Sequence, residues 1–273
     1  MIRGKGNKSF MNLSKKEFIE VAIETFRNAE NKHNDALILA KNSSYGMAIS
    51  ALILSLEENM KAVILFLDGN GFELTKRVKG VKNLFVNHKL RYPLGFVLSG
   101  FNIFGNDLII FISKIVLNPS MVKDFNINEK EWESLALNYI LEKINQLDEE
   151  IIWFSNAEYL RQDGMYVDYD NIMKTPLSVD REDFNDVLVR VSRIREFINK
   201  FLPIFDQSYE GDDAAEFKIE VKKLQKKLVS EKGYDKIGEI VSKINERGNN
   251  PFIEISKNLQ KFKKDIDFTK NED

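Results

Sequence analysis

The sequence predicts a mainly α-helical protein. Apolar residues recur at helical spacing along several long segments, and no segment shows the sustained polar–apolar alternation of a β-strand. Five prolines and 14 glycines are few among 273 residues, which disfavours a turn-rich β architecture. A hydrophobic fraction of 43% is enough for a sizeable core, and the length favours either one large domain or one domain with an appendage. We therefore expect an all-α helical bundle over residues 1–201 and a helical extension over residues 202–273.

The first two predicted helices form an antiparallel pair. Ser14, followed three residues later by Glu17, is typical of a capping box, so a helix begins there and continues to about Lys41. The turn "NSSYG" (42–46) leads into a second helix, which "DGNG" (68–71) ends. Because the connection is short, the two helices are expected to lie side by side.

The middle of the chain is expected to contain further helices separated by loops. The glycines of "SGFNIFGND" are candidates to interrupt the first of them, and "QLDEE" is interpreted as a joint between the next two. The segment "QDGMYVDYDN" (162–171) carries turn residues and aromatic side chains. The predicted helices span Phe96–Leu117, Asn128–Asn145, Asp148–Arg161 and Asp180–Lys200.

The chain beyond residue 201 is expected to differ in organisation. A linker is predicted over Leu202–Ala214, followed by roughly three amphipathic helices rich in Lys and Glu and a frayed charged tail from Asp265. The segment "KKLQKKL" (222–228) places four lysines on one helix face. Either a solvated surface or a contact with nucleic acid or another partner accounts for such a face.

Composition excludes several classes of protein. The chain has no cysteine, which rules out disulfides and thiolate metal sites. Its 40 Lys and Arg residues against 42 Asp and Glu residues give a net charge of −2, so a nucleic-acid partner would need a local basic patch. The N-terminus lacks the apolar segment of a signal peptide. The apolar segment Ala48–Leu67 contains three charged residues at its centre, which are too costly in lipid, so we expect a cytoplasmic protein without a membrane span.

Those three charges, Glu57, Glu58 and Lys61, are the most informative feature of the sequence. Glu57 and Lys61 are four residues apart and therefore share a helix face. One interpretation is an ordinary surface salt bridge. The other is a partly buried polar cluster, because the neighbouring side chains are apolar almost all round and a buried charge requires a partner. The candidate basic partners are Lys61, His88, Lys89, Arg91 and Arg161.

The two histidines of the chain are expected to have different roles. His33 lies within the first predicted helix and is expected to be structural. His88 lies beside Lys89 and near Arg91, and these cations lower its proton affinity unless a glutamate compensates. Two distant histidines lack the compact spacing of zinc ligands, so no metal is expected.

A third cluster follows in "RQDGMYVDY" (161–169). Arg161, Tyr166 and Asp168 bring a cation that can bind phosphate near a phenol and a carboxylate. The alternative is a helix C-terminus with Gly164 near the C′ position and Tyr166 packed back on the bundle.

These three clusters, in this order, resemble the AbiV family of abortive-infection proteins, a branch of the HEPN superfamily. The matching text is "RNAENKHNDALILAKNSSYGMAISALILSLEENMKA" (27–62), "NHKLR" (87–91) and "RQDGMYVDY" (161–169). The likeness covers roughly residues 15–200 and implies a HEPN-like helical bundle, commonly dimeric, that stops phage growth by shutting down translation. HEPN proteins are often metal-independent ribonucleases, with an arginine followed four to six residues later by a histidine. Here Tyr166 stands where that histidine belongs.

A catalytic hypothesis follows from the resemblance. Cleaving RNA without a metal needs an acid and base and a cation for the developing phosphorane charge. In this hypothesis His88 is the acid/base, Glu57 or Glu58 orients it, and Arg161 binds phosphate. Tyr166 positions the substrate. The predicted substrate-binding residues are Lys61, Lys89, Arg91 and Asp168.

A non-catalytic alternative remains open. The same polar residues would then hold the bundle together, and a helical surface would recognise a phage product or the translation machinery. A carboxylate metal site is disfavoured because di-iron bundles carry a Glu-x-x-His motif on each of two helices, whereas this sequence has it once, from Glu30 to His33. The expected partners are RNA, a second copy of the chain and a phage-encoded activator, with no membrane and no cofactor.

Overall fold

The computed structural model describes residue 10, residues 12–111 and 129–205, and scattered positions between 226 and 263. Two compact units make up the chain. The first combines Met1–Gly95 with Ala157–Asn249, and the second combines Phe96–Asn156 with Asn250–Asp273. The predicted division at residue 201 stays a prediction, because most of the extension lies outside the described residues.

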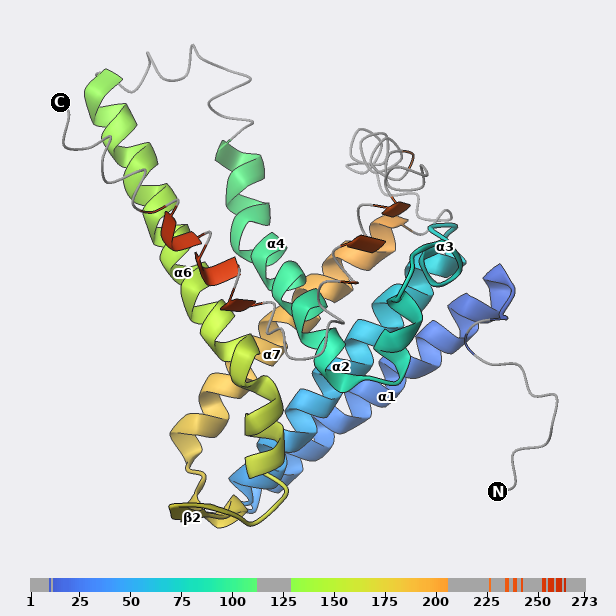
Figure 1. Ribbon diagram of the computed structural model, residues 1–273, viewed down its shortest axis with the longest axis vertical. Helices are drawn as coiled ribbons and strands as arrows, with labels where there is room; N and C mark the ends of the chain where they lie inside the picture. Colours follow the sequence, from blue (N-terminus) through green and yellow to red (C-terminus); the bar gives the residue numbers. More distant parts are fainter. Residues whose placement is uncertain are drawn as a thin grey trace. The chain divides into compact units, whose positions relative to one another are not determined.

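The first unit is built on an antiparallel helix pair, α1 (Lys15–Lys41) and α2 (Tyr45–Gly69), as the sequence predicts (Figure 1). The capping box is confirmed, since the amide of Glu17 donates to Ser14 Oγ and the amide of Ser14 donates to Glu17 Oε2. The helices approach closely because small side chains lie between them. Three fully or almost fully buried alanines recur every seven residues along α1: Ala22, Ala29 and Ala36. The carbonyl of Ala29 accepts from Ser55 Oγ of α2 at 2.7 Å.

Helix α7 (Arg181–Phe201) packs along α2. Its N-terminus is capped by Asp180, whose carboxylate accepts from the amides of Glu182 and Asp183 at 2.8 and 2.9 Å. The buried stripe of α7 consists of Phe184, Val187, Val191, Ile194 and Ile198. The helix predicted over Asp180–Lys200 is therefore confirmed, and a short 3₁₀ helix, η5 (Leu202–Phe205), follows where a linker was predicted.

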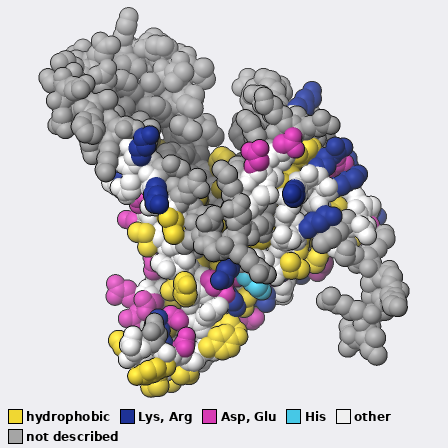
Figure 2. All heavy atoms as spheres, viewed as in Figure 1, with side chains coloured by type: hydrophobic (Ala, Val, Ile, Leu, Met, Phe, Trp, Pro, Cys, Tyr) yellow, Lys and Arg dark blue, Asp and Glu magenta, His cyan; other side chains and the backbone are white. Residues whose placement is uncertain are grey.

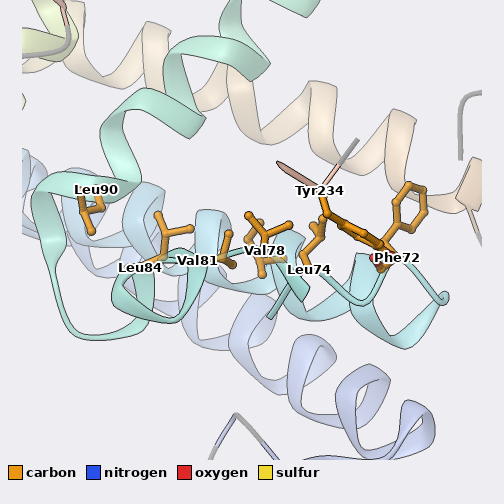
Figure 3. Close-up of a cluster of buried hydrophobic side chains, with 8 residues drawn as sticks. Phe72, Leu74, Val78, Val81, Leu84, Leu90 and Tyr234 are labelled. Carbon is orange, nitrogen blue, oxygen red and sulfur yellow. Dashed lines mark hydrogen bonds between the residues drawn. The ribbon is translucent and has the colours of Figure 1, made fainter. Parts of the chain in front are cut away.

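Between α2 and the next long helix, the chain forms three short helical turns: α3 (Leu74–Arg77), η1 (Val81–Phe85) and η2 (His88–Leu90). Asp68, buried at the end of α2, accepts from the amides of Leu74 and Thr75 at 2.5 and 3.0 Å and so fixes the start of this segment. The apolar side chains of the three turns are buried in one cluster with Phe72 and Tyr234, as Figure 3 shows.

Two sequence predictions about the long helices are wrong. Helix α4 (Arg91–Phe111) begins earlier than predicted and is continuous through its glycines, because a glycine inside a helix costs only about 1 kcal/mol. Residues 112–117 lie outside the described part of the chain. Helix α6 (Glu129–Asp163) is a single 35-residue helix, so "QLDEE" is helix interior rather than a joint. Its Glu150 points inward in the second unit and accepts from Ser99 Oγ at 2.5 Å.

After α6 the chain forms a small antiparallel hairpin that the sequence did not predict. Strands β1 (Asp168–Asp170) and β2 (Ile172–Lys174) pair with Tyr169 opposite Met173. Asn171 has a φ of 59°, a left-handed conformation that asparagine tolerates, and it forms the turn. A 3₁₀ turn, η4 (Pro176–Ser178), then leads to α7. Apart from this hairpin, the described residues confirm the predicted all-α class.

Within the described residues, no helix combines the length and apolar character needed to span a membrane. The cytoplasmic location stays a prediction. The predicted helices beyond residue 205 and the lysine face of residues 222–228 fall almost entirely outside the described residues.

Candidate functional site

Glu57 lies at the centre of a buried polar network in the first unit. Helix α2 turns this side chain inward, where it is 1% exposed. Its Oε2 accepts from Arg91 Nη1 at 2.9 Å and contacts His88 Nδ1, and its Oε1 accepts from the Tyr92 hydroxyl at 2.8 Å. A buried carboxylate is tolerated when it is paired and hydrogen-bonded in this way. The interpretation of a buried cluster is therefore the one that the structure supports for Glu57.

Arg91, at the first residue of α4, is the main counter-charge of Glu57. Its guanidinium is 2% exposed and also donates to two backbone carbonyls of η1, from Nε to Leu84 at 2.8 Å and from Nη2 to Phe85 at 3.1 Å. These bonds use donors on all three of its nitrogens and reduce the cost of burying the charge. This burial argues against the substrate-binding role predicted for Arg91.

Tyr92 links Glu57 to a second carboxylate. Its hydroxyl lies 2.8 Å from Glu57 Oε1 and 2.9 Å from Glu158 Oε2. Burial, together with these two carboxylates, raises the pKa of Tyr92 far above its usual value of 10, so the phenol keeps its proton. One hydroxyl proton serves two acceptors and can be donated to only one of them at a time.

Arg161, near the end of α6, completes the network. Its Nη2 and Nε donate to Glu158 at 2.8 and 3.2 Å, and its Nε lies 3.7 Å from Glu57 Oε1. Burial alone would raise the pKa of Glu158, but hydrogen bonds from Arg161 and Tyr92 outweigh it, so the pKa is lowered. The bond to Glu158 likewise raises the pKa of Arg161. Both groups are therefore charged.

The charges of this network balance when His88 is neutral. Two carboxylates, Glu57 and Glu158, face two guanidiniums, Arg91 and Arg161. Protonation of His88 therefore adds one uncompensated positive charge to the network.

His88 is the member of the network that reaches solvent. Its side chain is 46% exposed, although its carboxylate partner is 1% exposed. Since Nδ1 faces Glu57, we assign the ring proton to Nδ1, which leaves Nε2 as the basic nitrogen. In the part of the chain that the structure describes, Nε2 has no hydrogen-bond partner. The pair has the form of a buried carboxylate that orients an accessible imidazole, an arrangement typical of general acid–base sites.

Glu58 and Lys61 lie outside this network. The alternative interpretation, a surface salt bridge between Glu57 and Lys61, does not hold, because Lys61 instead pairs with Glu58, three residues before it. The side chains of Glu58 and Lys61 are 17% and 19% exposed, whereas that of Glu57 is 1% exposed. Asn28 of α1 donates a further hydrogen bond to Glu58 at 3.2 Å.

Tyr166 and Asp168 are also separate from the network. Tyr166 is 58% exposed, and its amide donates to the carbonyl of Gln162 at 2.9 Å, as at the end of a helix. Asp168 begins β1 and accepts from the amide of Tyr169. Their predicted roles at the substrate therefore receive no support from this geometry. Lys89 is exposed in η2, directly after His88.

Sequence reasoning did not find Tyr92 or Glu158. Glu158 precedes Arg161 by three residues on α6, a spacing that places the two on one helix face and offered a signal. Tyr92 follows Arg91 directly, but nothing in the sequence shows that its hydroxyl reaches a carboxylate 35 residues earlier.

His33 has the structural role expected for it. It is 4% exposed on α1, and its Nε2 lies 3.2 Å from Ser192 Oγ of α7. Arg195 of α7 contacts the ring at 3.3 Å and pairs with Glu30 at 2.9 Å. Burial and then the nearby Arg195 lower the pKa of His33, while Glu30 raises it in part.

The residues that the structure describes contain no cluster of three or more His, Cys, Asp or Glu side chains that could hold a metal ion. The network of Glu57, His88, Arg91, Tyr92, Glu158 and Arg161 thus consists of an imidazole, two carboxylates, two guanidiniums and a phenol. Side chains of these kinds can transfer protons and bind anions.

The part of the chain that the structure describes is an all-α bundle, which agrees with the helical fold expected of a HEPN protein. The model of the HEPN_AbiV family, described as AbiV, matches residues 17–196, which include every residue of the network. The chain therefore belongs to the AbiV family, and at the level of that family it is an abortive-infection protein of the HEPN type. No curated protein and no solved structure matches the chain.

Proposed function

We propose that the protein stops phage growth by cleaving RNA that translation requires, with His88 as general acid and base. The observation that carries this proposal is the contact between buried Glu57 and Nδ1 of the half-exposed His88. Family membership supplies the abortive-infection context. The RNA substrate and the reaction are our inference from the chemistry of the site.

The proposed reaction needs no metal. Nε2 of His88 takes the proton of a ribose 2′-hydroxyl, the 2′-oxygen attacks the adjacent phosphorus, and the bond to the 5′-oxygen breaks. The imidazolium then returns its proton to the leaving 5′-oxygen, and a 2′,3′-cyclic phosphate remains. Because the network is neutral before proton uptake, the new positive charge forms while negative charge builds up on the phosphorane. Lys89, which is exposed beside His88, is the nearest cation in sequence to assist.

The test compares His88→Ala with Val86→Ala, a matched control two residues away whose side chain is 75% exposed. We expect His88→Ala to lose phage protection and to reduce RNA breakage after infection by about 10²–10⁴-fold, the usual contribution of a general acid or base. Val86→Ala should match the wild type. The readouts are plaque counts and gel profiles of tRNA, rRNA and mRNA from infected cells. Full protection and unchanged RNA breakage with His88→Ala would contradict the proposal.

A non-catalytic binding protein is the second candidate. The observation in its favour is that Glu57, Arg91 and Tyr92 are only 1–3% exposed, so most of the network is closed to a substrate. In that case the network stabilises the first unit, and another surface recognises a phage product or the translation machinery. Protection that survives His88→Ala but is lost when the unit is destabilised supports this candidate.

Two partners belong to the proposal because the AbiV likeness implies or permits them. One is a second copy of the chain, which light scattering tests by whether the mass in solution is twice that of the chain. The other is a phage-encoded activator, for which phage mutants that escape protection are the test.

A further inference from the structure

One segment of the first unit departs sharply from the balanced charge of the protein. Residues 74–91, "LTKRVKGVKNLFVNHKLR", contain six Lys and Arg residues, one histidine and no Asp or Glu, although the chain as a whole has 42 acidic residues and 40 basic ones. The segment comprises α3, η1, η2 and the first residue of α4, and it includes His88.

The segment is amphipathic in three dimensions. The side chains of Leu74, Val78, Val81, Leu84 and Leu90 lie in a row along α2, as Figure 3 shows, and each is at most 9% exposed. Burying this row leaves the intervening lysines on the outer side of the segment. We call these exposed side chains the basic strip; they are Lys76, Lys79, Lys82 and Lys89. Figure 2 shows Lys and Arg side chains gathered over the region of α3.

The lysines of the basic strip are not neutralised by ion pairs. Of the other two cations in the segment, Arg77 pairs with Glu73 at 2.6 Å and Arg91 is buried against Glu57. None of the four lysines forms an ion pair with a carboxylate in the described residues. Their positive charge is therefore available to an anion from solution.

The two ends of the basic strip differ. Near Lys79, a hollow of about 500 Å³ is lined by Arg77 and also by the acidic residues Asp235 and Glu239. These carboxylates weaken the field there. Lys89 follows His88 directly in η2, and Lys82 belongs to η1, which packs against η2. The positive charge that these carboxylates do not offset thus includes that of Lys89, beside the proposed catalytic residue His88.

We infer that the basic strip binds the phosphate backbone of single-stranded RNA and leads it to His88. This inference rests on the proposed function of the site. A row of exposed lysines binds successive phosphates without reading bases, and binding of this kind releases counterions and weakens steeply with salt. The largest aromatic side chain of the segment, Phe85, is partly buried, so the basic strip offers charge rather than a stacking surface.

The test removes two charges from the basic strip and two from elsewhere. The double variant Lys82→Gln/Lys89→Gln is compared with Lys41→Gln/Lys200→Gln, which removes two exposed lysines at the C-terminal ends of α1 and α7. For the binding measurement all are made in full-length protein carrying His88→Ala, so that RNA is not cleaved, and for protection and cleavage the same double variants are made with His88 intact. The probe is a labelled single-stranded RNA of about 12 nucleotides, followed by fluorescence anisotropy at several salt concentrations.

We expect the strip variant to bind about tenfold more weakly at low salt. Its plot of log K against log salt concentration should be shallower by about 1.4, since each phosphate contact on a single strand contributes about 0.7. The control should keep the affinity and slope of its parent, and thermal melting should show that every variant is folded. Equal affinity and slope in the two double variants would overturn the inference. Absence of RNA binding by the parent would also overturn the inference. In that case, loss of protection by Lys82→Gln/Lys89→Gln with His88 intact would point to a different anionic partner.

The outcomes separate this inference from the proposed function. If infected cells with the wild-type protein show no RNA breakage but the basic strip binds RNA as expected, the catalytic proposal fails and the binding surface stands. If RNA breakage depends on His88, but the two Lys→Gln changes leave RNA binding normal in the His88→Ala protein and RNA cleavage normal when His88 is intact, the catalytic proposal stands and the basic strip does not carry the RNA.

Discussion

At the scale of single residues, the network around Glu57 combines rigidity with one accessible group. The charges of Glu57 and Arg91 are removed from water, and each is compensated by the other and by further hydrogen bonds. Such a pair contributes little net stability, but removing one partner leaves an uncompensated buried charge. Removing one partner therefore costs much more free energy than the intact pair contributes. Because the pair fixes Glu57, it also holds the Nδ1 side of His88 in place.

This asymmetry gives a prediction for Arg91. We expect Arg91→Met to lower the free energy of unfolding by about 3–5 kcal/mol, because the buried Glu57 loses its main counter-charge. The control is Arg27→Met, which removes an arginine that is 63% exposed and paired with Glu24 on the surface of α1. It should change stability by less than about 1 kcal/mol. Urea denaturation measures both, and similar losses in the two variants would show that the buried pair has no special role.

His33 gives a prediction about pH. Its pKa in the folded protein lies below the ordinary value of 6.5, chiefly because of burial and secondly because of Arg195, with Glu30 acting in the opposite direction. As pH falls below about 6.5, the unfolded chain therefore binds a proton that the folded chain resists, and stability falls. Above that pH His33 makes no such contribution. We expect urea denaturation to show a loss of stability between about pH 7 and pH 5 that is smaller in His33→Gln. His88 is present in both proteins, so identical pH profiles would exclude His33 as the cause.

At the scale of elements, the position of Arg161 depends on how the end of α6 meets the start of α2. Ser50 Oγ of α2 donates to the carbonyl of Arg161 at 2.7 Å. Gly164 lies against the same turn of α2, and a Cβ atom there would fall 2.2 Å from the carbonyl oxygen of Gly46 and 2.4 Å from Ser50 Oγ. A glycine is therefore required at this crossing for steric reasons.

The substitution Gly164→Ala tests this crossing. We expect a loss of about 1–3 kcal/mol in unfolding free energy, because backbone atoms must shift to make room. The same shift moves Arg161 away from Glu57, so phage protection should fall as well. Gly100→Ala, within α4, is the control, since a Cβ atom at Gly100 would lie at an ordinary 3.6 Å from Leu147 Cδ2. That substitution should be neutral or stabilising by up to about 1 kcal/mol, and equal thermal melting of the two variants would contradict the steric explanation.

At the scale of the whole molecule, charge is unevenly distributed although the total is close to zero. The net charge of −2 gives no general attraction to nucleic acid, yet residues 74–91 carry only positive formal charges. From the net charge alone, the sequence indicates that a nucleic-acid partner would need a local basic patch. It did not identify the basic strip, because the exposure of its lysines follows from the burial of the apolar row against α2.

The sequence by itself determined the all-α class, the antiparallel pair of α1 and α2 and the cap of α1, and it indicated a buried charge in α2 as one of two interpretations. These are local properties: Ser14 caps the helix that follows it, and the apolar residues around Glu57, Glu58 and Lys61 indicate that at least one of these charges is buried. Tertiary structure decided that Glu57 rather than Glu58 meets Arg91 and His88, and that Tyr92 and Glu158 join them while Tyr166 does not. The physical reason is that helical periodicity assigns residues to the faces of one helix. Only the packing of helices against one another decides which faces meet across 30 or more residues of chain.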